Sequence, residues 1–163
     1  FPYIQKNLDD IITVPDEDLV VAFLDMVENH KMIVENSGLL TVAALKYLDV
    51  KNKKVVSILS GGNMDVITMS SVVQQGLIFR DRIFTVSVLL PDKPGELSRV
   101  AGVIADVNGN VIKLEHNQFV STNRSAAVEL RITLEAFGTT HKNEIIEALN
   151  KNGYQPKVVR TMM

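Results

Sequence analysis

Two short segments of the sequence combine residue types that bind small charged molecules. The first is Ser60, Gly61, Gly62 and Asn63, which directly follows the apolar run 55–59. A serine hydroxyl at the end of a buried strand can donate a hydrogen bond to a cofactor, and glycines let a ligand approach the backbone. A simple flexible turn is the alternative, because one Gly-Gly pair is weak evidence for binding.

The second segment, residues 91–97, lies between an alternating apolar run and an apolar helical pattern. Asp92 can cap a helix, Pro94 suits a first helical turn, and Glu96 favours the positive end of the helix dipole. Gly95 allows close approach of a ligand or of another backbone. Free amides at such a helix start suit a small carboxylate, although most strand–turn–helix junctions of this kind bind nothing.

The second half of the chain places this turn in a regular pattern of elements. The expected order is a strand over 84–90, a helix from 94 to 108–109, a strand over 111–120, a hairpin turn at 121–124, a strand over 126–136, a helix over 138–153 and a strand over 154–160. We expect Ile112 and Leu114 to face inward, and Pro156 to mark an edge strand. This βαββαβ order predicts an α+β, ferredoxin-like domain with two helices on one face of a four-stranded antiparallel sheet.

The first half predicts a different arrangement. It begins with a short β-prone run within 8–14, followed by a helix whose first turn is 15–18 and which ends near 29–30. A second helix opens at 37–38, a strand follows at 55–59, and a helix covers 64–75. The uninterrupted apolar strand is typical of a parallel sheet, so we interpret this half as an α/β fragment. Gly76 can end the last helix, which predicts a boundary near residues 76–82 and two domains, 1–77 and 78–163.

Composition excludes several classes of function. The 163 residues contain 17 basic and 19 acidic side chains and no cysteine. There is no basic stripe for nucleic acid, no apolar run long enough for a bilayer, and neither disulfides nor thiolate metal sites. The three histidines lack ligand spacing, so we expect no metal site. No signal peptide is apparent, and a cytoplasmic location is the expectation.

The segment Leu89-Leu-Pro-Asp-Lys-Pro-Gly-Glu-Leu97, with its apolar helix and Asn108-Gly-Asn110, resembles the opening of an ACT domain. Members of that family are regulatory modules that bind an amino acid at this turn, commonly across a dimer interface. The resemblance implies effector-binding residues at Asp92, Lys93, Pro94, Gly95, Glu96, Leu97, Asn110, Val111 and Ile112. It also implies a homo-oligomer formed through the ACT domains.

Residues 9–14, 35–38 and 55–63 together resemble the C-terminal part of a threonine or serine ammonia-lyase of the tryptophan-synthase-β-like family, whose cofactor is pyridoxal 5'-phosphate (PLP). The resemblance implies that Ser60 faces the pyridine nitrogen, that Gly61, Gly62 and Asn63 flank it, and that Glu35 lies near the ring. A neutral hydroxyl partner makes the ring a mild electron sink, which favours β-elimination. A helix-start carboxylate is an equally weighted interpretation of Glu35.

Neither the Schiff-base lysine nor the glycine-rich phosphate loop of these enzymes appears in the sequence. We therefore expect no catalytic residue, no bound PLP and no activity in this chain alone. Two hypotheses follow: the regulatory portion of a threonine ammonia-lyase, which forms 2-oxobutanoate, or an amino-acid-sensing dimerisation module without a catalytic role. A related PLP enzyme, a serine dehydratase or racemase, is a further alternative. Isoleucine is the effector that the family suggests, with valine and serine left open.

Overall fold

The computed structural model describes residues 1–117 and 128–161. The chain forms two compact units, residues 1–76 and 77–163, which are described separately. Each unit has its own cluster of buried apolar side chains.

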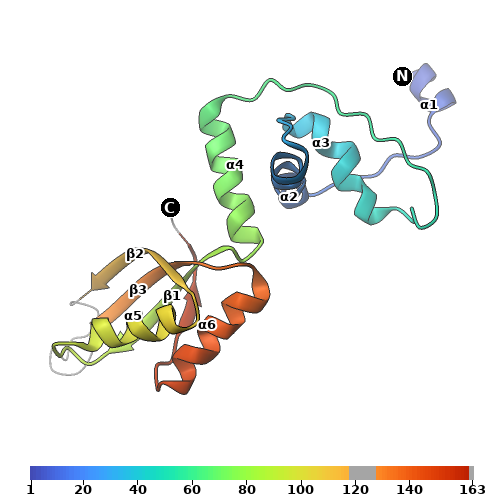
Figure 1. The fold of residues 1–163 in the computed structure, drawn as a ribbon. Helices are drawn as coiled ribbons and strands as arrows, with labels where there is room; N and C mark the ends of the chain where they lie inside the picture. The colour runs from blue at the N-terminus through green and yellow to red at the C-terminus, as the bar shows by residue number, and fades with distance from the viewer. Residues whose placement is uncertain (118–127, 162–163) are drawn as a thin grey trace. The chain divides into compact units, whose positions relative to one another are not determined.

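The second unit is built on a four-stranded sheet. Its strands are β1 (Ile83–Leu90), β2 (Asn110–Asn117), β3 (Val128–Glu135) and β4 (Lys157–Val159), in the order β2-β3-β1-β4, and every neighbouring pair is antiparallel. The helices α5 (Glu96–Asp106) and α6 (Thr139–Lys151) pack against one face of this sheet (Figure 1). The predicted βαββαβ order, and the edge position of the last strand, are confirmed.

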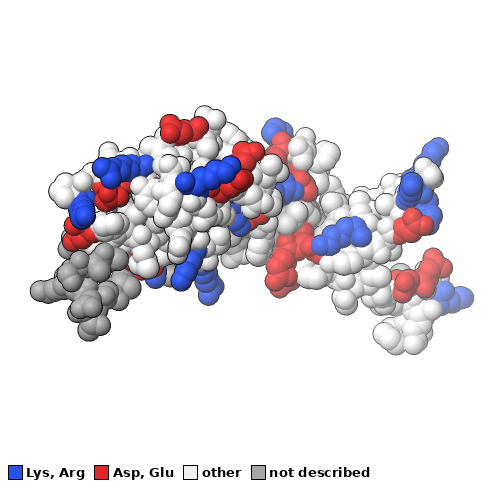
Figure 2. Space-filling model, turned by 90° about the horizontal axis from the view of Figure 1, so that it is seen from below, with Lys and Arg blue, Asp and Glu red and all other residues white. Residues whose placement is uncertain are grey.

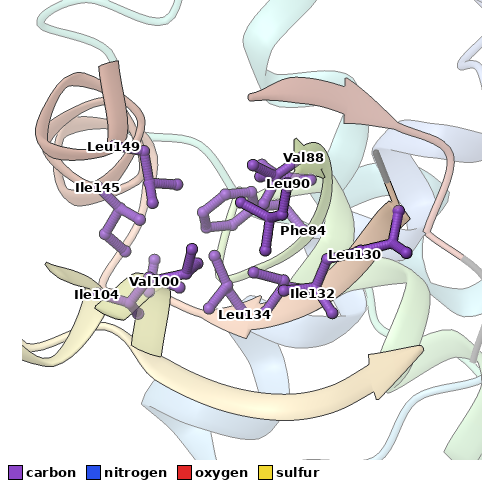
Figure 3. Packing of buried hydrophobic residues seen from close by; sticks show 13 residues of the cluster. Phe84, Val88, Leu90, Val100, Ile104, Leu130, Ile132, Leu134, Ile145 and Leu149 are labelled. Atoms are coloured by element: carbon purple, nitrogen blue, oxygen red, sulfur yellow. The ribbon is translucent and has the colours of Figure 1, made fainter. Parts of the chain in front are cut away.

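The core of this unit lies between the sheet and the two helices (Figure 3). Alternate residues of β3, namely Val128, Leu130, Ile132 and Leu134, are buried, as the period-2 pattern predicts. They meet Val100 and Ile104 of α5 and Ile145 and Leu149 of α6. Burying each such side chain contributes roughly 1.5–3 kcal/mol, so this core anchors the turn between β1 and α5.

The edge strand β2 differs from the prediction in the direction of its side chains. Val111 pairs with Leu134 and Lys113 with Thr133, so the ladder is irregular between them and Ile112 is the extra residue. A bulge of this kind interrupts the alternation of faces. Val111 therefore packs on the core, whereas Ile112 is 45% exposed, so its predicted inward position is wrong. Leu114 pairs with the buried Ile132 but remains 38% exposed at the sheet edge.

The helix α5 begins two residues later than the sequence predicts. Gly95 is the N-terminal capping residue, with φ +90°, and no side chain caps the helix. The predicted capping role of Asp92 is therefore wrong. Glycine suits this position because φ in this range strains other residues. The opposite end agrees with the prediction, since the helix ends at Asp106 and Asn108 takes a left-handed conformation.

The first unit is mostly helical. It contains α1 (Pro2–Asn7), α2 (Asp16–Asp25), a π-helical segment (Met26–His30), α3 (Asn36–Ala43), a 3₁₀ segment (Ala44–Tyr47) and most of α4 (Val66–Phe79). Phe23 and Leu39 are fully buried where α2 packs on α3, and Val72 of α4 joins the same cluster. Residues 8–14, predicted to be β-prone, form no strand.

The predicted buried strand at 55–59 is also absent. Residues 55–59 form no strand in the structure, and Val56 and Ile58 are 89% and 72% exposed. A strand needs neighbours to take up its backbone hydrogen bonds. The described part of this unit contains no strand, so the structure does not show the α/β arrangement expected for residues 1–77.

The sequence indicated that Gly76 ends the preceding helix, and this prediction is wrong. α4 continues to Phe79, and Gly76 is buried against Leu24 of α2. A Cβ atom at this position would lie 3.3 Å from Leu24 Cβ, so the glycine allows close helix packing. Asp65 caps the helix start, since its Oδ1 accepts hydrogen bonds from the amides of Ile67 and Thr68 at 3.0 and 2.9 Å.

Candidate functional site

The turn between β1 and α5 presents backbone donors at an exposed helix start. Lys93 N donates to Pro91 O at 2.8 Å, and Arg99 N donates to Gly95 O at 3.1 Å. Between them, no other described residue accepts a hydrogen bond from the amides of Leu97 and Ser98. These two donors and the positive helix end suit a carboxylate.

The predicted side chains of this turn behave differently from one another. Asp92 and Lys93 are exposed, whereas the Glu96 carboxylate pairs with Arg99 Nη1 at 2.8 Å. Apart from its two chain neighbours, no described residue lies within 4 Å of where a Cβ of Gly95 would be. The approach that Gly95 permits is therefore open to a ligand or to another chain.

The remaining predicted effector residues lie at the other end of α5. Asn110 is the first residue of β2, four positions after the end of α5, and its side chain donates to Glu135 Oε2 at 3.1 Å. Eleven helical residues separate this end from Gly95, which is a rise of roughly 16 Å. One small ligand cannot contact both Gly95 and Asn110 of the same chain. The predicted set thus divides into two half-sites, residues 92–97 and 110–112.

A surface hollow beside this turn is lined by residues of α5 and by the residues that follow α6. It has a volume of about 620 Å³ and is open to solvent. Its lining includes Leu89, Pro91, Glu96, Arg99, Asp106 and Tyr154. No pattern in the sequence indicates this hollow, because Tyr154 and Glu96 come from segments far apart in the chain.

In the first unit the structure brings the two predicted cofactor segments together. Glu35 Oε1 accepts a hydrogen bond from Ser37 Oγ at 2.6 Å, and Glu35 Oε2 accepts one from Asn63 N at 3.2 Å. The amide of Glu35 donates to Gly61 O at 3.3 Å. Glu35 therefore holds the segment 60–63 against the start of α3.

Two glycines make this approach possible. A Cβ at Gly61, where φ is +81°, would lie 2.5 Å from Glu35 Cδ, and a Cβ at Gly38 would lie 2.0 Å from Ser60 O. Both distances are shorter than any van der Waals contact, so no larger residue fits. Ser60 itself is exposed, and its hydroxyl forms no hydrogen bond with another described residue.

His141 is a buried polar residue for which the sequence indicates no role. Its Nε2 lies 2.7 Å from Val107 O, its Nδ1 accepts from Phe137 N at 3.1 Å, and its ring stacks on Phe137 at 4.7 Å. Because both nitrogens have partners, His141 joins α6 to the ends of α5 and β3. Its role is structural, and no periodic pattern in the sequence indicates it.

No described helix is long and apolar enough to cross a membrane. On the face drawn in Figure 2, basic and acidic side chains are interspersed, with no broad area of one sign. Among the described residues, no group of three His, Asp or Glu side chains could hold a metal ion.

The fold and the turn define the class of this unit. A βαββαβ sheet with its ligand-suited turn after the first strand is the arrangement expected of an ACT regulatory module. The family model of the ACT domain matches residues 84–153, so this part of the chain is similar to the ACT domain family.

The whole chain is similar to threonine ammonia-lyases. It is 31% identical over 160 residues to the L-threonine ammonia-lyase of Thermotoga maritima and 34% identical over 163 residues to that of Geobacter sulfurreducens. Each alignment covers 98% of this chain and 40% of the relative. The "L-threonine dehydratase biosynthetic IlvA" of Halalkalibacterium halodurans is 26% identical over 157 residues, which are 95% of this chain and 37% of that protein. Both resemblances inferred from the sequence are thereby confirmed, and the chain spans about 40% of the length of these relatives.

Proposed function

We propose that residues 78–163 bind an amino-acid effector and regulate the PLP-dependent deamination of threonine to 2-oxobutanoate. The observation that carries this proposal is the turn after β1. There Gly95 has φ +90°, and the amides of Leu97 and Ser98 have no partner among the described residues. An effector carboxylate would accept hydrogen bonds from these amides. Isoleucine is the first candidate effector, because the relatives include biosynthetic threonine dehydratases.

The effector site would be completed by a second copy of the chain. β2 is an edge strand that carries the exposed Ile112 (45%) and Leu114 (38%), and Leu97 at the start of α5 is also exposed, at 47%. If two β2 edges pair antiparallel, the half-site 92–97 of one copy lies near the half-site 110–112 of its partner. Such pairing would also cover the three apolar side chains.

Residues 1–77 would form the C-terminal part of the catalytic domain. Val56 and Ile58 support this assignment, because an extended apolar segment that lacks strand partners needs a sheet to cover it. The sheet would come from the part of the relatives that this chain does not span. Since the Schiff-base lysine motif is also absent, we expect the chain alone to be inactive.

The residues present fit PLP at one point. The exposed Ser60 hydroxyl is free to donate a hydrogen bond to the pyridine nitrogen. When bound, the cofactor would supply the electron sink for elimination of the threonine hydroxyl group. Glu35, whose carboxylate is bonded to Ser37 and Asn63, would orient the 60–63 segment and thereby Ser60.

Isothermal titration calorimetry of this chain against isoleucine, valine, threonine and serine tests effector binding. We expect saturable heat with one of them, lost in Gly95→Asp, which places a carboxylate beside the expected ligand carboxylate. Gly95→Asn is the matched control, because asparagine tolerates a left-handed conformation without adding charge. Absence of heat with all four amino acids, on a folded dimeric sample, would contradict the proposal.

An amino-acid-sensing dimerisation module is the second candidate, favoured by the fact that the ACT unit has its own complete core. The two candidates share the effector turn and differ in whether Ser60 meets PLP. In a protein that carries this chain together with the region that the relatives have in addition, Ser60→Ala would change the absorption spectrum of bound PLP only under the first hypothesis.

A further inference from the structure

The face of the ACT sheet that is turned away from α5 and α6 carries a second hollow. Its residues follow from the strand register: Lys113, Thr133 and Thr85 lie in one row across β2, β3 and β1, and Glu115 and Arg131 lie in the next. Arg160, just after β4, closes the end of the first row. These six side chains line a hollow of about 220 Å³.

The charges around this hollow leave one cation without a partner. Lys113 Nζ pairs with Glu115 Oε1 at 2.7 Å, and Arg131 Nε lies 3.3 Å from Glu129 Oε1. Arg160 forms no ion pair with any other described residue. Arg131 Nε is also buried without a well-directed hydrogen bond to a described residue. The hollow therefore has an excess of positive charge and of unused donors, within a chain whose net charge is -2.

The floor of the hollow adds a neutral donor. Thr85 Oγ1 and Thr133 Oγ1 lie 3.0 Å apart and form a hydrogen bond, and both residues are buried at 6% and 5% exposure. In this pair one hydroxyl donates its proton to the other, so the second hydroxyl still has a proton that it can donate to a ligand. A buried polar pair beneath charged side chains is unusual, since strands normally bury apolar residues.

We propose that this hollow binds a small oxyanion, a phosphate or carboxylate group, between Arg160, Arg131 and the Thr85–Thr133 pair. Guanidinium groups suit such ligands because their N–H donors match two oxygens at once. Glu115 does not oppose binding strongly, because Lys113 already neutralises it. The site lies on the face opposite the helices, so it is separate from the proposed effector turn.

The test is a nuclear magnetic resonance titration of the complete 163-residue chain with sodium phosphate, and separately with sodium acetate. Sodium chloride keeps the ionic strength constant, and the amides of Thr85, Lys113 and Thr133 are followed. We expect saturable shifts at these amides with at least one anion, and Arg160→Gln should weaken binding about fivefold or more. The matched control is Lys151→Gln, which removes the same charge on α6 and should leave binding unchanged.

Comparison of phosphate with acetate identifies the ligand group, since tighter binding of one assigns the site to that class. Arg160 lies beyond the last strand, so its substitution leaves the sheet ladders intact. Shifts that do not saturate, or that are equal in Arg160→Gln and Lys151→Gln, would mean a general ion atmosphere and would overturn the proposal. Arg131→Gln provides a second variant, and unchanged affinity in both arginine variants would also overturn it.

Discussion

Lys142 Nζ lies 2.6 Å from Asp81 Oδ1 and so joins α6 to the turn that follows α4. Thr139 Oγ1 donates to the other carboxylate oxygen of Asp81 at 2.8 Å. Lys142, and then Thr139, hold the pKa of Asp81 below its ordinary value. The carboxylate of Asp81, two residues before the start of β1, therefore has two side-chain partners on α6.

This pair should make stability depend on pH. Because the folded-state pKa of Asp81 is lowered, its contribution is complete above about pH 4 and is lost as pH falls through the folded-state value. Asp81→Asn should therefore cost about 1 kcal/mol at pH 7 and progressively less below pH 4. Asparagine tolerates the left-handed backbone of this position (φ 54°), so strain does not add to the effect. Urea unfolding, followed by amide signals of β1 and β3, checks both values; an equal cost at pH 7 and pH 3 would contradict it.

Two glycines near α5 should respond in opposite ways to alanine. Apart from its chain neighbours and the nearby backbone of α5 itself, a Cβ at Gly102 would meet nothing within 4 Å, so Gly102→Ala should stabilise the unit by about 0.5–1 kcal/mol through its helix propensity. A Cβ at Gly109 would lie 2.6 Å from Ile104 Cγ2 and 3.1 Å from Ile145 Cδ1. Gly109→Ala should cost about 1–3 kcal/mol through overpacking. Thermal unfolding of both variants makes the comparison, and the same sign for both would refute it.

His141→Ala should be among the more damaging substitutions in the ACT unit. It leaves Val107 O and Phe137 N without their partners and opens a cavity beside the Phe137 ring. We expect a loss of about 2–3 kcal/mol in the free energy of unfolding. His116→Ala, at an exposed position on β2, is the control and should change it by no more than about 0.5 kcal/mol. Similar losses in the two variants would argue against the structural role of His141.

The Thr85–Thr133 pair should behave non-additively. Either Thr→Val change alone leaves the other hydroxyl buried without its partner, whereas the double change removes both polar groups at nearly constant volume. We expect the double variant to be more stable than the sum of the two single effects indicates, by about 1 kcal/mol. A double-mutant cycle measured by urea unfolding gives this value, and strict additivity would exclude the coupling.

The sequence was sufficient to predict the ACT half of the fold where one face of an element is buried. Leu130, Ile132 and Leu134 alternate cleanly, and the structure buries all three. Ile112 was misplaced because a bulge adds one residue without any change in the local pattern. Residues 118–127, which include the predicted turn at 121–124, lie outside the described residues.

The first half was harder to predict because its pattern depends on partners elsewhere. Val56 has the character of a buried strand residue, yet a strand forms only beside another strand. Gly76 has the character of a helix end, and only the position of Leu24 shows that it serves packing instead. In the candidate sites, the residue types at Glu35, Ser60 and Gly95 were apparent from the sequence. The contact between Glu35 and Asn63, and the separation of Gly95 from Asn110, required the fold.

The interlock of Gly38 with Ser60 and of Gly61 with Glu35 also limits how such a sequence can diverge. Any side chain at Gly38 displaces the Ser60 backbone, and any side chain at Gly61 displaces the Glu35 carboxylate. The two segments, which lie more than twenty positions apart, must therefore change in sequence together or not at all. A substitution in one segment alone would give a poorly folded protein, so we expect both segments to evolve slowly.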